Sequence, residues 1–170
     1  MKTLVIHPYD PTTEFLSVIY SEHEDWNVIK SDIGVDRLKS EIKCHDRIIM
    51  LGHGNSLGLG VNSKYIIDKN FVPILKKKEC VCIWCDADVF TEANGINGLC
   101  TGMIISDIDE SYLFCVSSTI EEIEFSNKLF ASAISKAIDC DNPLDVINSI
   151  YQGDSEVISF NSANIFYKKD

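Results

Sequence analysis

The clearest fold signal in this sequence is an apolar run that stops abruptly: Arg47-Ile48-Ile49-Met50-Leu51-Gly52-His53-Gly54-Asn55. An uninterrupted apolar run of this length is typical of a strand that is buried on both faces, as strands of a parallel sheet are. The change to glycine and polar residues marks the end of that strand. The stretch therefore predicts a central parallel strand, followed directly by polar residues such as His53 that can take part in binding or catalysis.

Similar apolar runs alternate with helical patterns along the rest of the chain. The expected strands are Thr3–His7, Trp26–Lys30, Arg47–Leu51, Cys80–Trp84 and Gly102–Ser106, with closing edge strands at Val157–Phe160 and Asn164–Tyr167 and a hairpin or loop at Leu57–Val61. The expected helices begin near Asp10, Gly34, Phe71, Asp86, Ile120 and Asn142. This order predicts an α/β three-layer sandwich with a mostly parallel sheet and helices on both faces.

Composition fits one folded domain that spans residues 1–170. Hydrophobic residues make up 45% of the chain and charged residues 24%, which argues against long disordered segments. The 26 acidic and 15 basic residues give a formal net charge of −11. Such a surface repels phosphate backbones and anionic lipids, so we expect no nucleic-acid partner and no membrane partner.

The chain contains seven cysteines, an odd number, and most of them fall in apolar runs. We find no signal peptide at the start, so reduced cysteines and a cytoplasmic location are expected. Cys82 and Cys85 have C-x-x-C spacing, but no second Cys or His pair follows at the distance that a zinc site needs. We therefore expect no structural metal and no cofactor.

Polar residues follow each of four expected strands, and the carboxyl ends of parallel strands are where ligands bind. Besides His53 and Cys85, the candidates for contact with a substrate are His7, Asp10, Asn55, Asp86, Asp88 and Ser106. For the segment that contains His7 and Asp10, a plain strand, turn and helix cap is an equally good interpretation.

Two of these strand ends resemble the signature of the caspase-like cysteine peptidases, the clan of caspases, legumain, gingipains, separase and clostripain. The two strings are Ile48-Ile49-Met50-Leu51-Gly52-His53-Gly54 and, about thirty residues later, Val81-Cys82-Ile83-Trp84-Cys85. In that family an apolar strand ends in His-Gly, and a later apolar strand ends in the nucleophilic Cys. The resemblance implies a caspase-like sheet of flavodoxin-like type.

The same resemblance implies a role for each residue of the signature. His53 would be the general base or proton donor, and Cys85 the nucleophile. The Gly54 backbone N–H would help to form the oxyanion hole. The reaction would be acyl transfer through a thioester to water, with a peptide or protein as the substrate.

The chain departs from the family pattern on both sides of the cysteine. The family commonly has small residues there, whereas this chain has Trp84 and Asp86. Asp86 and Asp88 would raise the pKa of the Cys85 thiol. The same two carboxylates would alternatively line a pocket for a basic side chain, which implies a preference for Lys or Arg.

A second hypothesis is that the chain has the caspase-like fold but no catalytic activity. The chain would then be an inactive caspase-like module that holds a small ligand, such as one derived from a nucleotide, or a protein partner at the same sheet edge. The apolar face of Phe125–Phe130 can bury against this domain or against a second copy, so a homodimer is an open alternative.

Overall fold

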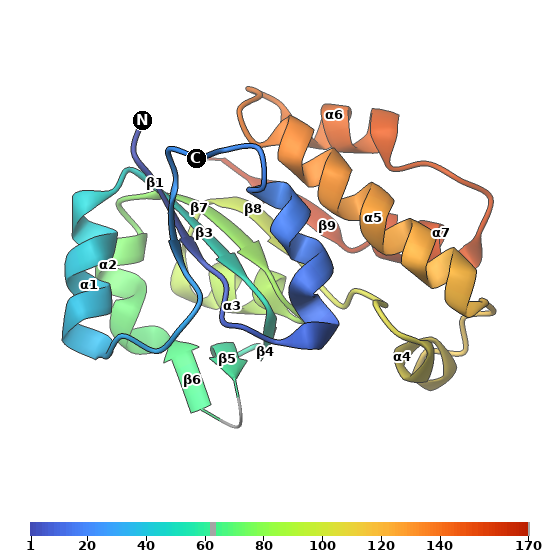
Figure 1. The fold of residues 1–170 in the computed structure, drawn as a ribbon, viewed down its shortest axis with the longest axis horizontal. Helices are drawn as coiled ribbons and strands as arrows, with labels where there is room; N and C mark the ends of the chain where they lie inside the picture. Colours follow the sequence, from blue (N-terminus) through green and yellow to red (C-terminus); the bar gives the residue numbers. More distant parts are fainter. Residues whose placement is uncertain (62–63, 170) are drawn as a thin grey trace.

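The computed structural model describes residues 1–61 and 64–169 and contains a central six-stranded sheet (Figure 1). Its strands, in spatial order, are β2 (Asn27–Ile29), β1 (Thr3–Ile6), β3 (Arg47–Leu51), β7 (Glu79–Ile83), β8 (Gly98–Thr101) and β9 (Ile165–Lys168). Neighbouring strands from β2 to β8 are parallel, and β9 runs antiparallel to β8 at the edge. The mostly parallel sheet expected from the sequence is thus confirmed.

Helices cover both faces of the sheet and complete a three-layer α/β sandwich (Figure 1). One face packs against the 3-10 helix η1 (Pro11–Ile19) and against α5 (Ile120–Ala137), α6 (Pro143–Ile150) and α7 (Glu156–Ser162). The other face packs against α1 (Val35–Cys44), the short 3-10 helix η2 (Lys69–Phe71), α2 (Val72–Leu75) and α3 (Ala87–Asn94). Helix α4 (Ile108–Leu113) follows β8.

Strand side chains alternate between the two helical layers, as period-two geometry requires. Val5, Ile49, Val81 and Leu99 contribute to the core on the α5 side. Leu4, Ile48, Cys80, Cys82 and Cys100 contribute to the core on the α1 side. Because both faces are buried, the central strands are apolar on both faces over most of their length, which explains why the sequence pattern identified them.

A small antiparallel sheet continues directly from β3 and consists of β4 (His53–Asn55), β5 (Gly58–Val61) and β6 (Lys64–Ile67). The expected hairpin at Leu57–Val61 forms part of it, because β5 pairs with both β4 and β6. Leu59 and Ile67 are fully buried in the core on the α1 side. The small sheet is therefore anchored to that layer, and it presents His53 at its first position.

The fifth strand lies earlier in the chain than the sequence predicted. The pairing residues are Gly98–Thr101, and the segment 102–106 is not a strand. Ile104 and Ile105 are buried all the same. The side chain of Asn161 accepts from the Ile105 N–H at 2.8 Å and donates to its carbonyl at 2.9 Å, so this backbone is satisfied without a sheet partner.

The prediction of a strand at Val157–Phe160 is wrong, because this segment is part of α7. Ser155 caps the helix by accepting a hydrogen bond from the Ile158 N–H. A short apolar run does not distinguish a buried strand from a helix, and the cap decides here. The following expectation, a strand at Asn164–Tyr167, is confirmed by β9 to within one residue.

No helix in the described ranges has the length and apolar character needed to cross a bilayer.

Candidate functional site

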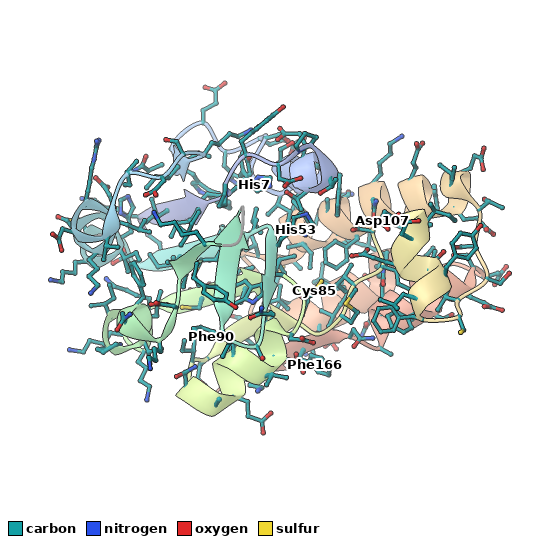
Figure 2. All side chains as sticks on the ribbon, turned by 90° about the horizontal axis from the view of Figure 1, so that it is seen from below. His7, His53, Cys85, Phe90, Asp107 and Phe166 are labelled. Atoms are coloured by element: carbon teal, nitrogen blue, oxygen red, sulfur yellow. The ribbon has the colours of Figure 1, made fainter. Side chains whose placement is uncertain are left out.

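His53 and Cys85 meet at the carboxyl edge of the sheet because β3 and β7 are adjacent parallel strands. Leu51 pairs with Ile83 at the last position of both strands. Beyond that pair, His53 and Cys85 line one small cavity of about 30 Å³, and Figure 2 shows both on this edge. The polar residues Thr13, Ser106 and Glu110 line the same cavity. The tertiary structure thus brings the two residues of the expected signature to a common site.

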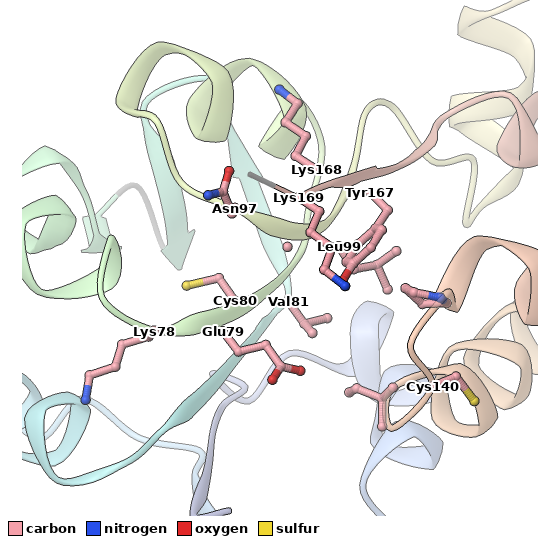
Figure 3. Close-up of a pocket in the computed structure, with 13 residues that line it drawn as sticks. Lys78, Glu79, Cys80, Val81, Asn97, Leu99, Cys140, Tyr167, Lys168 and Lys169 are labelled. Carbon is pink, nitrogen blue, oxygen red and sulfur yellow. The ribbon is translucent and has the colours of Figure 1, made fainter.

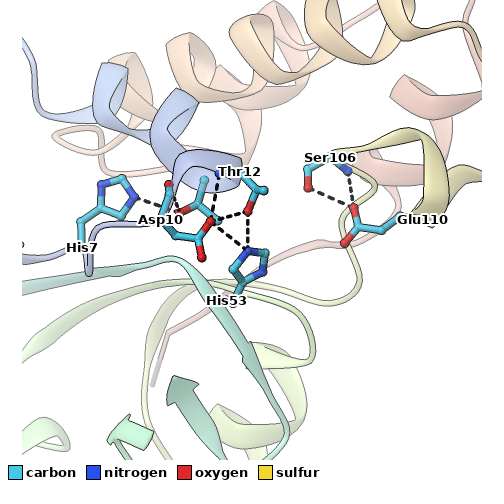
Figure 4. Close-up of polar contacts among 7 residues, drawn as sticks. His7, Asp10, Thr12, His53, Ser106 and Glu110 are labelled. Atoms are coloured by element: carbon cyan, nitrogen blue, oxygen red, sulfur yellow. Dashed lines mark hydrogen bonds and ion pairs between the residues drawn. The ribbon is translucent and has the colours of Figure 1, made fainter. Parts of the chain in front are cut away.

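A hydrogen-bonded chain supports the imidazole of His53 (Figure 4). The Thr12 hydroxyl donates to Asp10 Oδ1 at 2.7 Å, and the same hydroxyl oxygen lies 2.7 Å from His53 Nε2. Since its only hydrogen goes to Asp10, Thr12 accepts from a protonated Nε2. The neutral ring then has its lone pair on Nδ1, which makes His53 a base at that nitrogen.

Asp10 is the acidic end of this chain. The Thr12 hydroxyl and the Thr12 backbone N–H, in that order of importance, hold the pKa of the Asp10 carboxyl below its ordinary value of 3.8. The carboxylate caps η1 and lies 3.8 Å from His53 Nε2. The sequence predicted Asp10 as a substrate contact, whereas its position suits the stabilisation of a positive charge on His53.

Cys85 is half-buried at the turn between β7 and α3. Burial raises the pKa of its thiol from 9.0 to about 11, and a hydrogen bond from the Ile104 backbone opposes that shift. The charges of Glu110 and then Asp86 raise the pKa further. The thiol is therefore protonated at neutral pH, and a reaction through sulfur needs a base.

The turn that carries Cys85 has an unusual backbone. Asp86 adopts φ 61° and ψ 24°, the left-handed region, immediately before the first residue of α3. Asp and Asn tolerate this conformation better than most side chains do. Asp86 is exposed at this sharp strand-to-helix turn. The left-handed conformation at this position favours Asp, which explains on structural grounds why an acidic residue follows Cys85.

The acidic residue at the cavity is Glu110, which the sequence did not single out for this role. Neither Asp86 nor Asp88 lines the cavity with Cys85. Asp88 lies in the first turn of α3, with its Oδ1 buried and without a hydrogen-bond partner in the described part of the chain. The Asp107-x-x-Glu110 spacing of a capping box was the sequence signal that this Glu turns back toward its own helix start.

Ser106 belongs to the loop after β8 and not to a strand end. Its backbone N–H and its hydroxyl both donate to Glu110 Oε2, at 2.7 and 3.0 Å (Figure 4). Asp107 and Glu110 also form the capping box of α4. Residues 1–61 and 64–169 contain no group of three His, Cys, Asp or Glu side chains arranged for a metal ion.

Two of the expected substrate contacts, His7 and Asn55, make hydrogen bonds within the fold. His7 is 1% exposed, and its Nδ1 lies 2.9 Å from the Tyr20 hydroxyl. The buried ring of His7 does not reach the surface. Burial also lowers its pKa below 6.5, so the ring is neutral at pH 7. Asn55 closes the hairpin, because its side chain contacts the Tyr65 hydroxyl and accepts from the Leu57 N–H.

Comparisons with known proteins give no assignment. No protein-family model matches the chain, and no curated protein matches it. Among solved structures, a D-lactate dehydrogenase of Treponema pallidum matches with a TM-score of 0.37 and 10% sequence identity. The match covers 68% of this chain and 34% of the dehydrogenase, so the chain spans about a third of that protein. A likeness at this level carries no argument about fold or function.

Proposed function

We propose that this chain is a caspase-like cysteine peptidase that uses Cys85 as the nucleophile and His53 as the general base. The observation that carries the proposal is the meeting of these two side chains at one cavity, from adjacent strand ends, with a Thr12–Asp10 chain behind the imidazole. A nucleophile, a base and a group that orients the base are the components of covalent acyl transfer.

The reaction begins when the Cys85 sulfur attacks the carbonyl carbon of the scissile bond. The thiol proton moves to His53 Nδ1, and the Gly54 N–H is the proposed donor to the oxyanion. As the C–N bond breaks, His53 returns the proton to the leaving amine, and a thioester remains. Water, with His53 again as the base, then hydrolyses the thioester to a carboxylic acid and the free thiol.

The electrostatics of the site favour a proton transfer that accompanies attack. With a pKa of about 11, the Cys85 thiol holds its proton until a base removes it. The imidazolium that results has a carboxylate behind it, since Asp10 Oδ1 lies 3.8 Å from Nε2. Asp10 thus stabilises the charge that His53 acquires.

The proposed substrates carry a basic side chain next to the scissile bond. Glu110 supports this preference because it lines the cavity and, within residues 1–61 and 64–169, the Ser106 and Asp107 donors bond to its Oε2 and not to its Oε1. The cavity of about 30 Å³ has room for a single water. A Lys or Arg side chain therefore enters only when lining side chains move.

The second candidate function is a non-catalytic caspase-like module that binds a small ligand or a protein partner at this edge. The raised pKa of Cys85 and the small cavity favour it. It differs from the peptidase in one measurable respect: the reactivity of Cys85 would not depend on His53.

The test is covalent labelling with a peptidyl electrophile that carries Lys or Arg, followed by mass spectrometry of each cysteine. The exposed thiols Cys44, Cys115 and Cys140 serve as internal references. We expect labelling at Cys85 to outpace all three references and to fall about a hundredfold in His53→Ala, the loss typical of a missing general base. The matched control is His23→Ala, which removes a histidine outside the cavity lining.

Two results would decide against the peptidase. If Cys85 is labelled no faster than the exposed thiols, Cys85 is not an activated nucleophile. If Cys85 is labelled at equal rates in His53→Ala and His23→Ala, His53 is not its base, and the binding module is the better proposal. Hydrolysis of a fluorogenic Arg or Lys peptide, lost in Cys85→Ser, would extend the result from reactivity to turnover.

A further inference from the structure

Trp84 occupies the position where the caspase-like signature has a small residue, and it lies at the junction of three elements. The side chain is 2% exposed and directly precedes Cys85. Its indole Nε1–H donates to the Asn55 carbonyl at 3.1 Å, which connects the end of β7 to β4. Its own carbonyl accepts from the Thr101 hydroxyl at 2.9 Å, and its ring meets the Phe90 ring edge-on.

The indole also lies directly on the backbone of Gly54. A Cβ atom at residue 54 would be 2.2 Å from Trp84 Cδ1 and 2.6 Å from the Gly58 carbonyl oxygen. Real carbon atoms do not approach so closely, so the ring takes the space that a side chain at residue 54 would fill. The Trp84 ring can therefore pack here only because the residue after His53 is a glycine.

This contact lies where the main sheet ends. The Gly52 N–H still donates to the Ile83 carbonyl at 3.1 Å, which continues the pairing of β3 with β7. After Gly52 the chain enters β4, which pairs with β5 and not with β7. From His53 onward, the indole of Trp84 provides one hydrogen bond and one ring contact between β4 and the Cys85 turn.

We propose that Trp84 is a positioning residue that holds β4, and with it His53, at a fixed distance from the Cys85 sulfur. This inference rests on the proposed function, since it concerns the same pair of reacting groups. Trp84 itself lines the cavity beside His53 and Cys85, but its side chain has no group that could take the thiol proton. Its effect comes through placement, because a displacement of about 1 Å between a base and a nucleophile can cost about a hundredfold in rate.

The experiment is a double-mutant cycle on the labelling rate of Cys85 in the full chain, with the Lys- or Arg-bearing electrophile as the probe. The four proteins are the natural sequence, Trp84→Phe, His53→Ala and the double variant. Phenylalanine fills part of the space but has no N–H for Asn55. The matched control is Phe90→Leu, which removes a ring packed on Trp84 but keeps the Trp84–Asn55 hydrogen bond.

If Trp84 acts by placing His53, Trp84→Phe slows Cys85 labelling about tenfold where His53 is present and does not change it in the His53→Ala background. Phe90→Leu, even with an equal fall in melting temperature, leaves the rate within about twofold. This pattern separates placement of the base from general loss of stability, which would change both backgrounds alike.

Equal slowing by Trp84→Phe in both backgrounds would overturn the inference alone, because Trp84 would then act on the surroundings of Cys85 without His53. No slowing in either background would overturn it as well. If His53→Ala by itself leaves the rate unchanged, the dyad fails, and the proposed function falls together with the inference.

Discussion

At the scale of single residues, one hydroxyl group links Asp10 to His53 in the candidate site. Thr12 has a single hydrogen to donate, and Asp10 takes it, so His53 must donate from Nε2. This arrangement fixes the ring tautomer and leaves Nδ1 available as a base. The sequence placed Asp10 at a strand end but gave no signal that residues 12 and 53 touch.

We therefore expect Thr12→Val to slow Cys85 labelling about tenfold, because valine has the same shape but cannot bridge Asp10 and His53. Thr12→Ser, which keeps the hydroxyl, should label within about twofold of the natural sequence. Thr12 is exposed, so neither change should move the melting temperature much. Equal rates in the two variants would show that the hydroxyl chain does not set the base.

At the scale of elements, the segment between β8 and α4 depends on a side chain from far along the chain. Asn161 of α7 is 0% exposed and bonds both backbone groups of Ile105. Asn161 thereby takes the place of a strand partner for the segment that contains Ile104 and Ser106 and leads into the helix of Glu110. The segment 102–106, which the sequence wrongly predicted to be a strand, is thus one whose backbone hydrogen bonds come from a distant residue.

Asn161→Ala should lower the free energy of unfolding by about 3 kcal/mol, since it leaves a buried N–H and a buried carbonyl unpaired. Urea unfolding measures this change. The control is Asn164→Ala, whose amide donates to the Phe160 carbonyl at 2.9 Å near the end of the same helix, and it should cost about 1 kcal/mol. Similar losses in both variants would contradict the role of Asn161.

At the scale of the whole molecule, the core holds several thiols in their neutral form. Burial raises the pKa of Cys80 to about 12 and that of Cys85 to about 11, and it raises those of Cys82 and Cys100 as well, from an ordinary value of 9.0. Above pH 9 the unfolded chain loses protons that the folded chain keeps. Alkaline conditions therefore favour unfolding.

The free energy of unfolding should fall as the pH rises from 9 toward 11, by up to about 1.4 kcal/mol per pH unit for each buried thiol. Cys80→Ala removes one such thiol and should make the decline shallower. Urea unfolding at pH 8, 9 and 10 measures both slopes, and the comparison between variants cancels the other groups that titrate in this range. Parallel slopes in the two proteins would rule out Cys80 as a contributor.

The sequence by itself determined the α/β class, the strands β1, β3 and β7, and the residues at the ends of these strands. The physical reason is that strands buried on both faces are largely apolar, and that the turns after such strands lie at the surface and are polar. Arg47–Leu51 is observed with the bounds expected, and His53 and Cys85 lie on one edge because their strands are neighbours.

Only the tertiary structure decided which of the strand-end residues lie together at the cavity. His7 is buried against Tyr20, Asn55 closes a hairpin, and Glu110 takes the place at the cavity expected for Asp86. These outcomes depend on contacts between residues far apart in the chain. A side chain's surroundings are set by packing across elements, and local patterns in the sequence do not encode them.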